Sequence, residues 1–236
     1  MKACDSSEMH NTCTDYSGLK RLDFLDIDAG KFFEETWQFD VCYSHRFPFN
    51  VLCNFSSSDF IFDGVYIASM EGFIQSLKSP DPEVQRDVCQ MNAPAAKEAG
   101  RRFERTGVFD GKHLFWLGKR FERLSAEYKV LLERVYEAKY KSDPEYRAVL
   151  QATNGYVLTH KVGKTNPMET VLTGDEFIEQ LDILRDKFND KSRKLTISQI
   201  IQWVVTTKSP PTDDSDSKWV SCISHSYNEE KRHGDE

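Results

Sequence analysis

An acid, an amide and a base follow one another along a short predicted helix that begins after Ser69. Glu71, Gln75 and Lys78 are spaced i, i+4 and i+7, which aligns them on one helix face. A fixed carboxylate can orient or deprotonate water and stabilise developing positive charge, and a nearby lysine can bind an anion. The same spacing is also typical of a solvated helix face, because Glu near the start and Lys near the end suit the helix dipole.

The element that must hold these three groups has an apolar second face. Its apolar residues recur at helical spacing and should face a core: Met70, Phe73, Ile74 and Leu77. Just before the helix, Asp63-Gly64 separates the apolar segments 60–62 and 65–67, which predicts a β-hairpin. The sequence therefore predicts two short strands leading directly into the helix that carries Glu71.

Further elements follow from the same kinds of signal. Apolar and β-forming residues predict short strands at 39–43, 51–55, 114–118 and 156–160. Capping residues predict the starts of further helices at Asp81, Asn92, Ser125, Asp143 and Thr173. Gly100 is the expected stop of the helix that begins at Asn92. The pattern has no βαβ repeat, so we expect an α+β fold, a helix-rich single domain with a small, mostly antiparallel sheet.

Composition divides the chain into four parts. Residues 1–18 are polar and are expected to form a mobile tail, and 19–188 are expected to form the main domain with a β-rich N-terminal extension. Residues 189–208 contain a Thr-x-x-Gln capping box and predict an additional amphipathic helix. Residues 209–236 are acidic and polar, which favours disorder.

Charge and cysteine content narrow the classes of function. The 236-residue chain has a formal net charge of −7, which argues against sequence-independent binding of nucleic acid over a broad surface. It contains no apolar segment long enough to cross a bilayer and no secretory signal. The six cysteines form no C-x-x-C pair, so we expect free thiols in a reducing compartment, the cytoplasm.

Two familiar motifs are incomplete. Gly163-Lys164-Thr165 resembles part of a phosphate-binding loop, but Leu158 stands where the first Gly belongs and Pro167 interferes with the following helix. The six histidines form no H-x-x-x-H or H-x-H pair, so we expect no metal site.

Residues 97–123 carry eight basic and four acidic residues, which suits a phosphate-bearing ligand or an ordinary solvated surface. Trp116 could stack on a nucleobase or could belong to the core.

The order of these residues resembles the NADAR superfamily, the YbiA-like N-glycosidases associated with NAD and ADP-ribose chemistry. The opening signature consists of Asn54-Phe55, Phe62-Asp63-Gly64, Ser69-x-Glu71 and Gln75-x-x-Lys78. Later segments follow in the same order: Ala96-Lys97, Gly100-Arg101, Trp116, Val149–Thr153 and Leu172–Arg185. The resemblance covers roughly residues 50–187 and implies a YbiA-like fold.

The resemblance implies a hydrolase that cleaves the N-glycosidic bond of a ribose-phosphate substrate without a metal or another cofactor. The substrate would be ADP-ribosylated guanine or a related ADP-ribose or riboflavin-intermediate compound, either free or attached to nucleic acid. Glu71 would stabilise the oxocarbenium-like sugar and activate water. The implied substrate-binding residues are Asn54, Gln75, Lys78, Arg101, Trp116, His160 and Glu169.

The chain departs from this family pattern at two places. Gly72 stands where the family usually has His, and the late Asp-x-x-Trp-Gly segment is replaced by residues 160–170, in which Glu169 is the nearest acidic substitute by position. These departures keep a second hypothesis open, a non-catalytic module that senses NAD or ADP-ribose. A third hypothesis is an interaction protein whose functional part is the acidic tail after Pro211.

Overall fold

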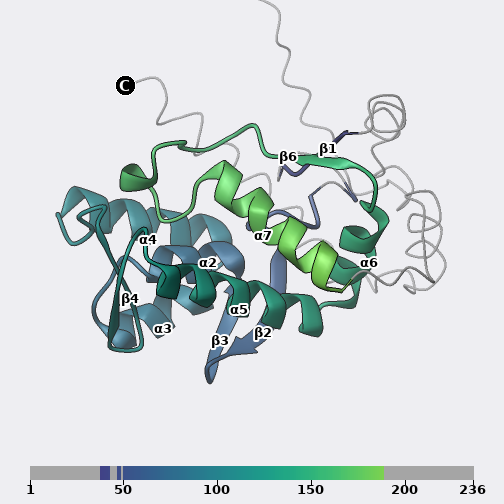
Figure 1. Ribbon diagram of the computed structural model, residues 1–236. Coiled ribbons are helices and arrows are strands. Elements are labelled where there is room, and N and C mark those ends of the chain that lie inside the picture. Colours follow the sequence, from purple (N-terminus) through teal and green to yellow (C-terminus); the bar gives the residue numbers. More distant parts are fainter. Residues whose placement is uncertain (1–37, 43–46, 49, 189–236) are drawn as a thin grey trace, which may run out of the picture. The chain divides into compact units, whose positions relative to one another are not determined.

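The computed structural model describes residues 38–42, 47–48 and 50–188, and all of them fall within one compact unit (Figure 1). The expected tail at 1–18, the amphipathic helix at 189–208 and the acidic tail at 209–236 lie outside the described residues. The described part has an α+β fold, as the sequence predicted. No helix in this part combines the length and the apolar character that crossing a membrane requires.

The strands of the described residues form three separate pairs. The predicted Asp63-Gly64 hairpin is confirmed, with both turn residues at positive φ, 48° and 78°. It joins β2 (Ser57–Phe62) to β3 (Val65–Ser69). A second antiparallel hairpin joins β4 (His113–Trp116) to β5 (Lys119–Glu122), and β1 (Gln38–Asp40) pairs in parallel with β6 (Val157–Thr159).

The helices begin where the capping residues predicted. Asp81, Asn92, Ser125 and Asp143 each accept a backbone N–H of the first helical turn, and Thr173 forms a capping box with Glu176. The α-helices are α2 (Met70–Ser76), α3 (Pro82–Gln90), α4 (Ala93–Arg105), α5 (Ala126–Ser142), α6 (Pro144–Ala152) and α7 (Gly174–Lys187). A 3₁₀ turn, η2 (Pro167–Glu169), precedes α7.

Two sequence-based expectations are wrong. Residues 51–55 form turns and not a strand, because their amides donate to nearby carbonyls, as Cys53 does to Asn50 at 3.1 Å. Leu52 and Cys53 are buried there and Val51 and Phe55 are partly buried, although the backbone is not extended. Gly100 does not end its helix, since α4 continues to Arg105. Its missing side chain serves packing between helices, as described below.

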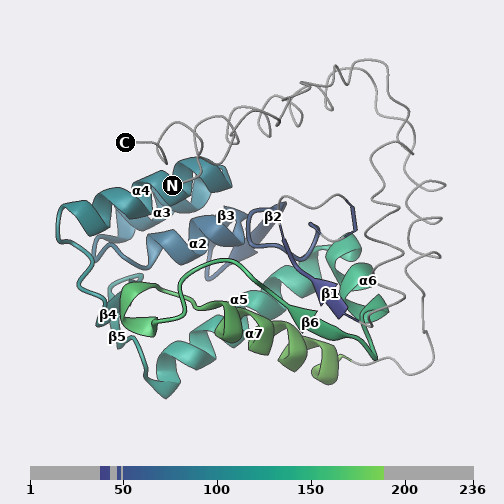
Figure 2. The same ribbon diagram turned by 90° about the horizontal axis from the view of Figure 1, so that it is seen from above.

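The core lies around α2, whose seven residues are all buried. Helix α2 packs against α3 and α4, and Figure 2 shows these three helices side by side. On its apolar face, Phe73 packs edge-on against Trp116 with ring centroids 4.9 Å apart. Helix α5 packs against α7 and β2 and completes the enclosure of the core.

One charged side chain lies within this core without a full set of partners. Lys139 of α5 is 0% exposed, and its Nζ has no hydrogen-bond partner among the described residues. The ammonium group lies 4.7 Å from the centroid of the Tyr146 ring. Burial lowers the pKa of Lys139 from 10.5 to about 8, while the negative charge of Asp143 opposes the shift. Lys139 therefore stays mostly protonated at neutral pH, and its buried charge lowers the stability of the folded protein.

Replacing this lysine should stabilise the fold. Because the pKa of Lys139 is lower in the folded state than in the unfolded state, its cost is full below about pH 8 and is relieved as pH rises toward 10.5. Lys139→Met should raise the free energy of unfolding at pH 7 by roughly 2–3 kcal/mol. Urea unfolding of both proteins from pH 7 to 10.5 measures this difference, which should shrink as pH rises.

The matched control is Lys129→Met, which changes an exposed lysine on the same helix. This variant should leave the free energy of unfolding nearly unchanged across the same range. A Lys139→Met protein that is less stable than the wild type at pH 7 would contradict the account of a penalised buried charge.

Candidate functional site

Glu71 lies in the first turn of α2, and two hydrogen bonds hold the start of this helix in place. The Ser69 hydroxyl caps α2 by accepting the amide of Gly72 at 3.1 Å. The amide of Glu71 itself donates to the backbone carbonyl of Asn54 at 2.9 Å. The residue is 7% exposed, so the carboxylate is held inside the protein by a rigid element.

The environment of Glu71 combines burial with surrounding positive charge. Gln75 Nε2 donates to Glu71 Oε1 at 2.8 Å. Burial raises the pKa of Glu71 above 4.5, and Lys97, the Gln75 hydrogen bond, Lys78 and Arg101 oppose this rise. The predicted row of Glu71, Gln75 and Lys78 is therefore a buried polar cluster and not a solvated helix face. A carboxyl group with a raised pKa can exchange protons at a less acidic pH than an ordinary glutamate.

Gly100 lets α4 approach this cluster closely. A Cβ atom at position 100 would lie 1.7 Å from Gln75 Oε1 and 3.1 Å from Lys78 Nζ. Any side chain there would therefore displace the amide that holds Glu71. The buried Gln75 Oε1 has no hydrogen-bond partner among the described residues, and it packs directly against the glycine.

Gly72 serves a similar purpose on the side of α3. A Cβ atom at position 72 would lie 3.2 Å from the backbone carbonyl oxygens of Val88 and Cys89. The larger His that the resembling family usually carries would push α3 away from α2. The departure from the family pattern at this position thus fits the close packing of these two helices.

The basic groups near Glu71 differ in how fully they are neutralised. Lys78 Nζ pairs with Glu104 Oε1 at 2.6 Å, and its side chain is 5% exposed. Burial lowers the pKa of Lys78, and the hydrogen bond and charge of Glu104 oppose this. Arg101 is more open, with 45% side-chain exposure and a longer contact of 3.6 Å to Glu98. Arg101 is therefore better placed than Lys78 to bind an anion that approaches from solvent.

Lys97 and Asn54 complete the cluster. The Lys97 ammonium lies 4.7 Å from the centroid of the Phe55 ring, and its charge is the strongest of those that stabilise the ionised Glu71. The Tyr136 hydroxyl donates to Asn54 Oδ1 at 2.8 Å. This bond orients the Asn54 side-chain amide, whose two N–H groups can donate to a ligand.

Trp116 lies on the other side of α2, in the aromatic core. It is 4% exposed and its ring stacks on Phe62 at a centroid distance of 5.9 Å. Its indole N–H donates to Asp63 at 3.0 Å. The structure therefore does not bring Trp116 together with Glu71. Trp116 instead lines a separate hollow of about 510 Å³ between the hairpin turns and α5.

The two late candidates, His160 and Glu169, do not join Glu71 directly. His160 Nδ1 is 2.6 Å from the carbonyl oxygen of Val41, and its ring packs edge-on against Phe177 at 5.0 Å. The Glu169 carboxylate is exposed and accepts the Asn166 side-chain amide at 2.8 Å. Another residue of the segment 160–170, Lys164, helps to lower the pKa of Lys78 through its positive charge.

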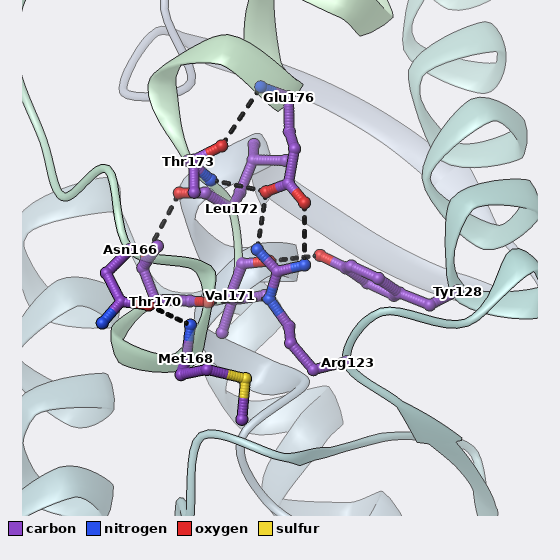
Figure 3. Close-up of polar contacts among 9 residues, drawn as sticks. All are labelled: Arg123, Tyr128, Asn166, Met168, Thr170, Val171, Leu172, Thr173 and Glu176. Atoms are coloured by element: carbon purple, nitrogen blue, oxygen red, sulfur yellow. Dashed lines mark hydrogen bonds and ion pairs between the residues drawn. The ribbon is translucent and has the colours of Figure 1, made fainter.

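A buried arginine fixes the segment that contains Glu169 (Figure 3). The Arg123 guanidinium, 2% exposed, forms two bonds with the Glu176 carboxylate, at 2.9 and 2.6 Å, and donates Nε to the carbonyl of Thr170 at 2.8 Å. The Tyr128 hydroxyl donates to the next carbonyl, that of Val171, at 2.6 Å. The chain between η2 and α7 is thereby tied to the start of α5.

Sequence reasoning missed Lys97, Gly100 and Lys164 as parts of the site. The i, i+4 spacing of Lys97 and Arg101 could have indicated that both reach the same surface. Arg123 was counted with a basic surface, but it is buried and paired. In the described part of the chain, no three His, Cys, Asp or Glu side chains gather as metal ligands would.

A substitution at Gly100 tests the close packing over the site. Gly100→Ala should lower the free energy of unfolding by about 1–3 kcal/mol, because the new methyl group overlaps Gln75. Most of this cost should disappear in a Gln75→Ala background, where the overlapping atoms are gone. Urea unfolding of the two single variants and the double variant measures the coupling. Strictly additive costs would contradict the proposed contact.

Comparison with known proteins places the chain in a family. No solved structure matches it. A protein of Enterobacteria phage T4, described as an uncharacterized 17.1 kDa protein in the Gp30-rIII intergenic region, is 36% identical over 151 residues. That similarity covers 63% of this chain and 97% of the phage T4 protein. The family described as bacteriophage protein GP30.3 matches residues 46–186, which contain the whole Glu71 cluster and all but the last residue of α7. The chain belongs to the bacteriophage GP30.3 family.

Proposed function

We propose that this protein is an N-glycosidase that hydrolyses the bond between a base and the ribose of a phosphate-bearing substrate. The observation that carries the proposal is the buried Glu71 carboxyl group, held by Gln75 and surrounded by Lys97 and Arg101. The resemblance of the Asn54 to Lys78 region to the NADAR superfamily supports the same chemistry. ADP-ribosylated guanine and related ADP-ribose or riboflavin-intermediate compounds are the substrate classes that this resemblance implies.

The proposed reaction uses Glu71 in its ionised form. The bond from the anomeric carbon to the base nitrogen breaks, and its electron pair leaves with the base. The carboxylate stabilises the positive charge that develops on the sugar. Water then bonds to the anomeric carbon through its oxygen and gives one proton to Glu71. Gln75 keeps the carboxylate in a single orientation, and no metal or redox cofactor is required for these steps.

The cations supply the binding energy for phosphate. Arg101 is partly exposed and can form two parallel hydrogen bonds to a phosphoryl group. Lys97, one helical turn earlier on α4, adds a second positive charge beside the carboxylate. The Asn54 amide can donate to a hydroxyl or carbonyl oxygen of the ligand. A small nucleotide or an ADP-ribosylated base is therefore the proposed partner, either free or as part of a nucleic acid.

A second candidate is a sensor that binds the same ligand without cleaving it. The pairing of Lys78 with Glu104 favours this candidate, since it removes a free cation from beside Glu71. The exposed Glu169 carboxylate, which accepts the Asn166 side-chain amide, also favours it, since Glu169 is the nearest substitute for the acidic residue of the late family motif. For either function we propose a cytoplasmic location, which agrees with the buried, unbridged thiols of Cys53 and Cys89.

Removal of the carboxylate separates the two candidates. Glu71→Gln should lower kcat by about a hundredfold or more, because the general base is lost, while the thermal unfolding midpoint stays near that of the wild type. Mass spectrometry of the base released from ADP-ribosylated guanosine, NAD and phosphorylated riboflavin intermediates measures this loss. Glu83→Gln, which alters an exposed carboxylate in the first turn of α3, is the matched control.

Binding of ADP-ribose without release of any base by the wild type would favour the sensor. Equal release by wild type and Glu71→Gln would exclude Glu71 as the catalytic group.

The dependence of kcat on pH should report the charge of Glu71. The ionised form is the active one, so activity should fall as pH drops through the raised pKa of Glu71. Lys97→Met removes the largest influence that lowers this pKa, so the acidic limb of the profile should move to higher pH. Arg102→Met, at an exposed position on the same helix, should leave the limb in place. A shift of the Lys97→Met limb to lower pH would contradict the assignment.

A further inference from the structure

Residues 160–173 are held as a rigid part of the protein at several points. Arg123 and Tyr128 bind the carbonyls of Thr170 and Val171, as seen in Figure 3. The Asn166 side chain accepts the amide of Met168 at 3.1 Å. On the other side, a Cβ atom at Gly111 would lie 2.1 Å from the Met168 carbonyl oxygen, so the segment packs directly on the turn before β4. These contacts limit how far the segment can move.

The turn that supports this segment also touches the Glu71 cluster. The Lys78 ammonium lies 5.2 Å from the centroid of the Phe109 ring, and Gly111 is only two residues further along the chain. The segment is thus joined to Lys78 through residues 109–111. The charge of Lys164 accordingly contributes to lowering the pKa of Lys78.

Lys164 keeps its positive charge available in this position. Its Nζ donates to the backbone carbonyl of Glu169 at 3.0 Å, which fixes the side chain without neutralising it. The Glu169 carboxylate binds the Asn166 amide instead. Among the described residues Lys164 forms no ion pair with a carboxylate, and its side chain is exposed to solvent. An anionic ligand can therefore reach it.

Positive charge thus acts on the Glu71 cluster from two separate elements, on Glu71 from one and on Lys78 from the other. Lys97 and Arg101 come from α4, and Lys164 comes from the segment between β6 and η2. A ligand with one phosphoryl group can be held by the α4 cations alone, whereas a second phosphoryl group offers a partner for the cation on the other element. We propose that Lys164 binds the second phosphoryl group of the substrate and makes the site select diphosphate-linked ribosides over monophosphates.

This inference rests on the proposed function, because it names a specificity determinant of the same site. It assigns Lys164 to substrate binding and gives it no part in bond cleavage. It also gives a physical role to the segment that replaces the late motif of the resembling family. The segment contributes a cation for the distal end of the ligand, where an acidic residue was expected.

Calorimetry with two ligands tests the inference. ADP-ribose and ribose 5-phosphate are titrated into Glu71→Gln, and into the same protein carrying Lys164→Met or, as control, Lys161→Met. Lys161 is an exposed lysine of the same segment. Loss of one charge-assisted contact should raise the Kd of ADP-ribose about tenfold in the Lys164→Met protein. The Kd of ribose 5-phosphate should stay the same, and Lys161→Met should change neither value.

Kinetics of the corresponding single variants give a second readout. Lys164→Met should raise KM for ADP-ribosylated guanosine about tenfold and leave kcat unchanged, since the residue does not touch the reacting bond. An unchanged Kd for ADP-ribose, or equal weakening of both ligands, would overturn the inference while the proposed function stands. Failure of both ligands to bind any of the proteins would overturn the inference and the proposed function together.

Discussion

The close contact of α4 with α2 at Gly100 is the constraint on which the site depends. It allows the backbone of α4 to cover Gln75, and Gln75 in turn holds Glu71. Without this contact the Glu71 row would face solvent, and its carboxyl group would behave as an ordinary surface glutamate. The same approach brings Lys97 and Arg101 to the carboxylate, so burial and positive charge arise from one packing arrangement.

A second constraint acts at the opposite end of the site. The buried Arg123 and Glu176 pair joins the start of α5 to the start of α7, and it fixes the intervening chain through the Thr170 carbonyl. Because both charges are largely buried, loss of either would leave the other unpaired in a medium of low dielectric constant. The position of Lys164 relative to Lys78 therefore depends on a bond that is remote from the carboxylate.

Local signals in the sequence predicted much of the fold, but not the packing between elements. Capping residues and the Asp63-Gly64 turn act within a few residues, so the helix starts and the hairpin were predictable. In the sequence, a glycine that ends a helix looks the same as a glycine that lets a neighbouring helix pack closely. For this reason Gly100 was wrongly predicted to end its helix. The spacing of Glu71, Gln75 and Lys78 predicted that they align on one helix face, but their burial depends on the packing of α4. The core position of Trp116 likewise depends on distant residues, because its ring packs on Phe62 and Phe73.

The most direct test of the account is a crystal structure of the Glu71→Gln protein soaked with ADP-ribose. The account predicts that the ribose lies against residue 71 and that the phosphoryl groups contact Arg101 of α4. Electron density for the ligand in the hollow beside Trp116, or at any site away from residue 71, would contradict the claim that the buried glutamate is the centre of the functional site.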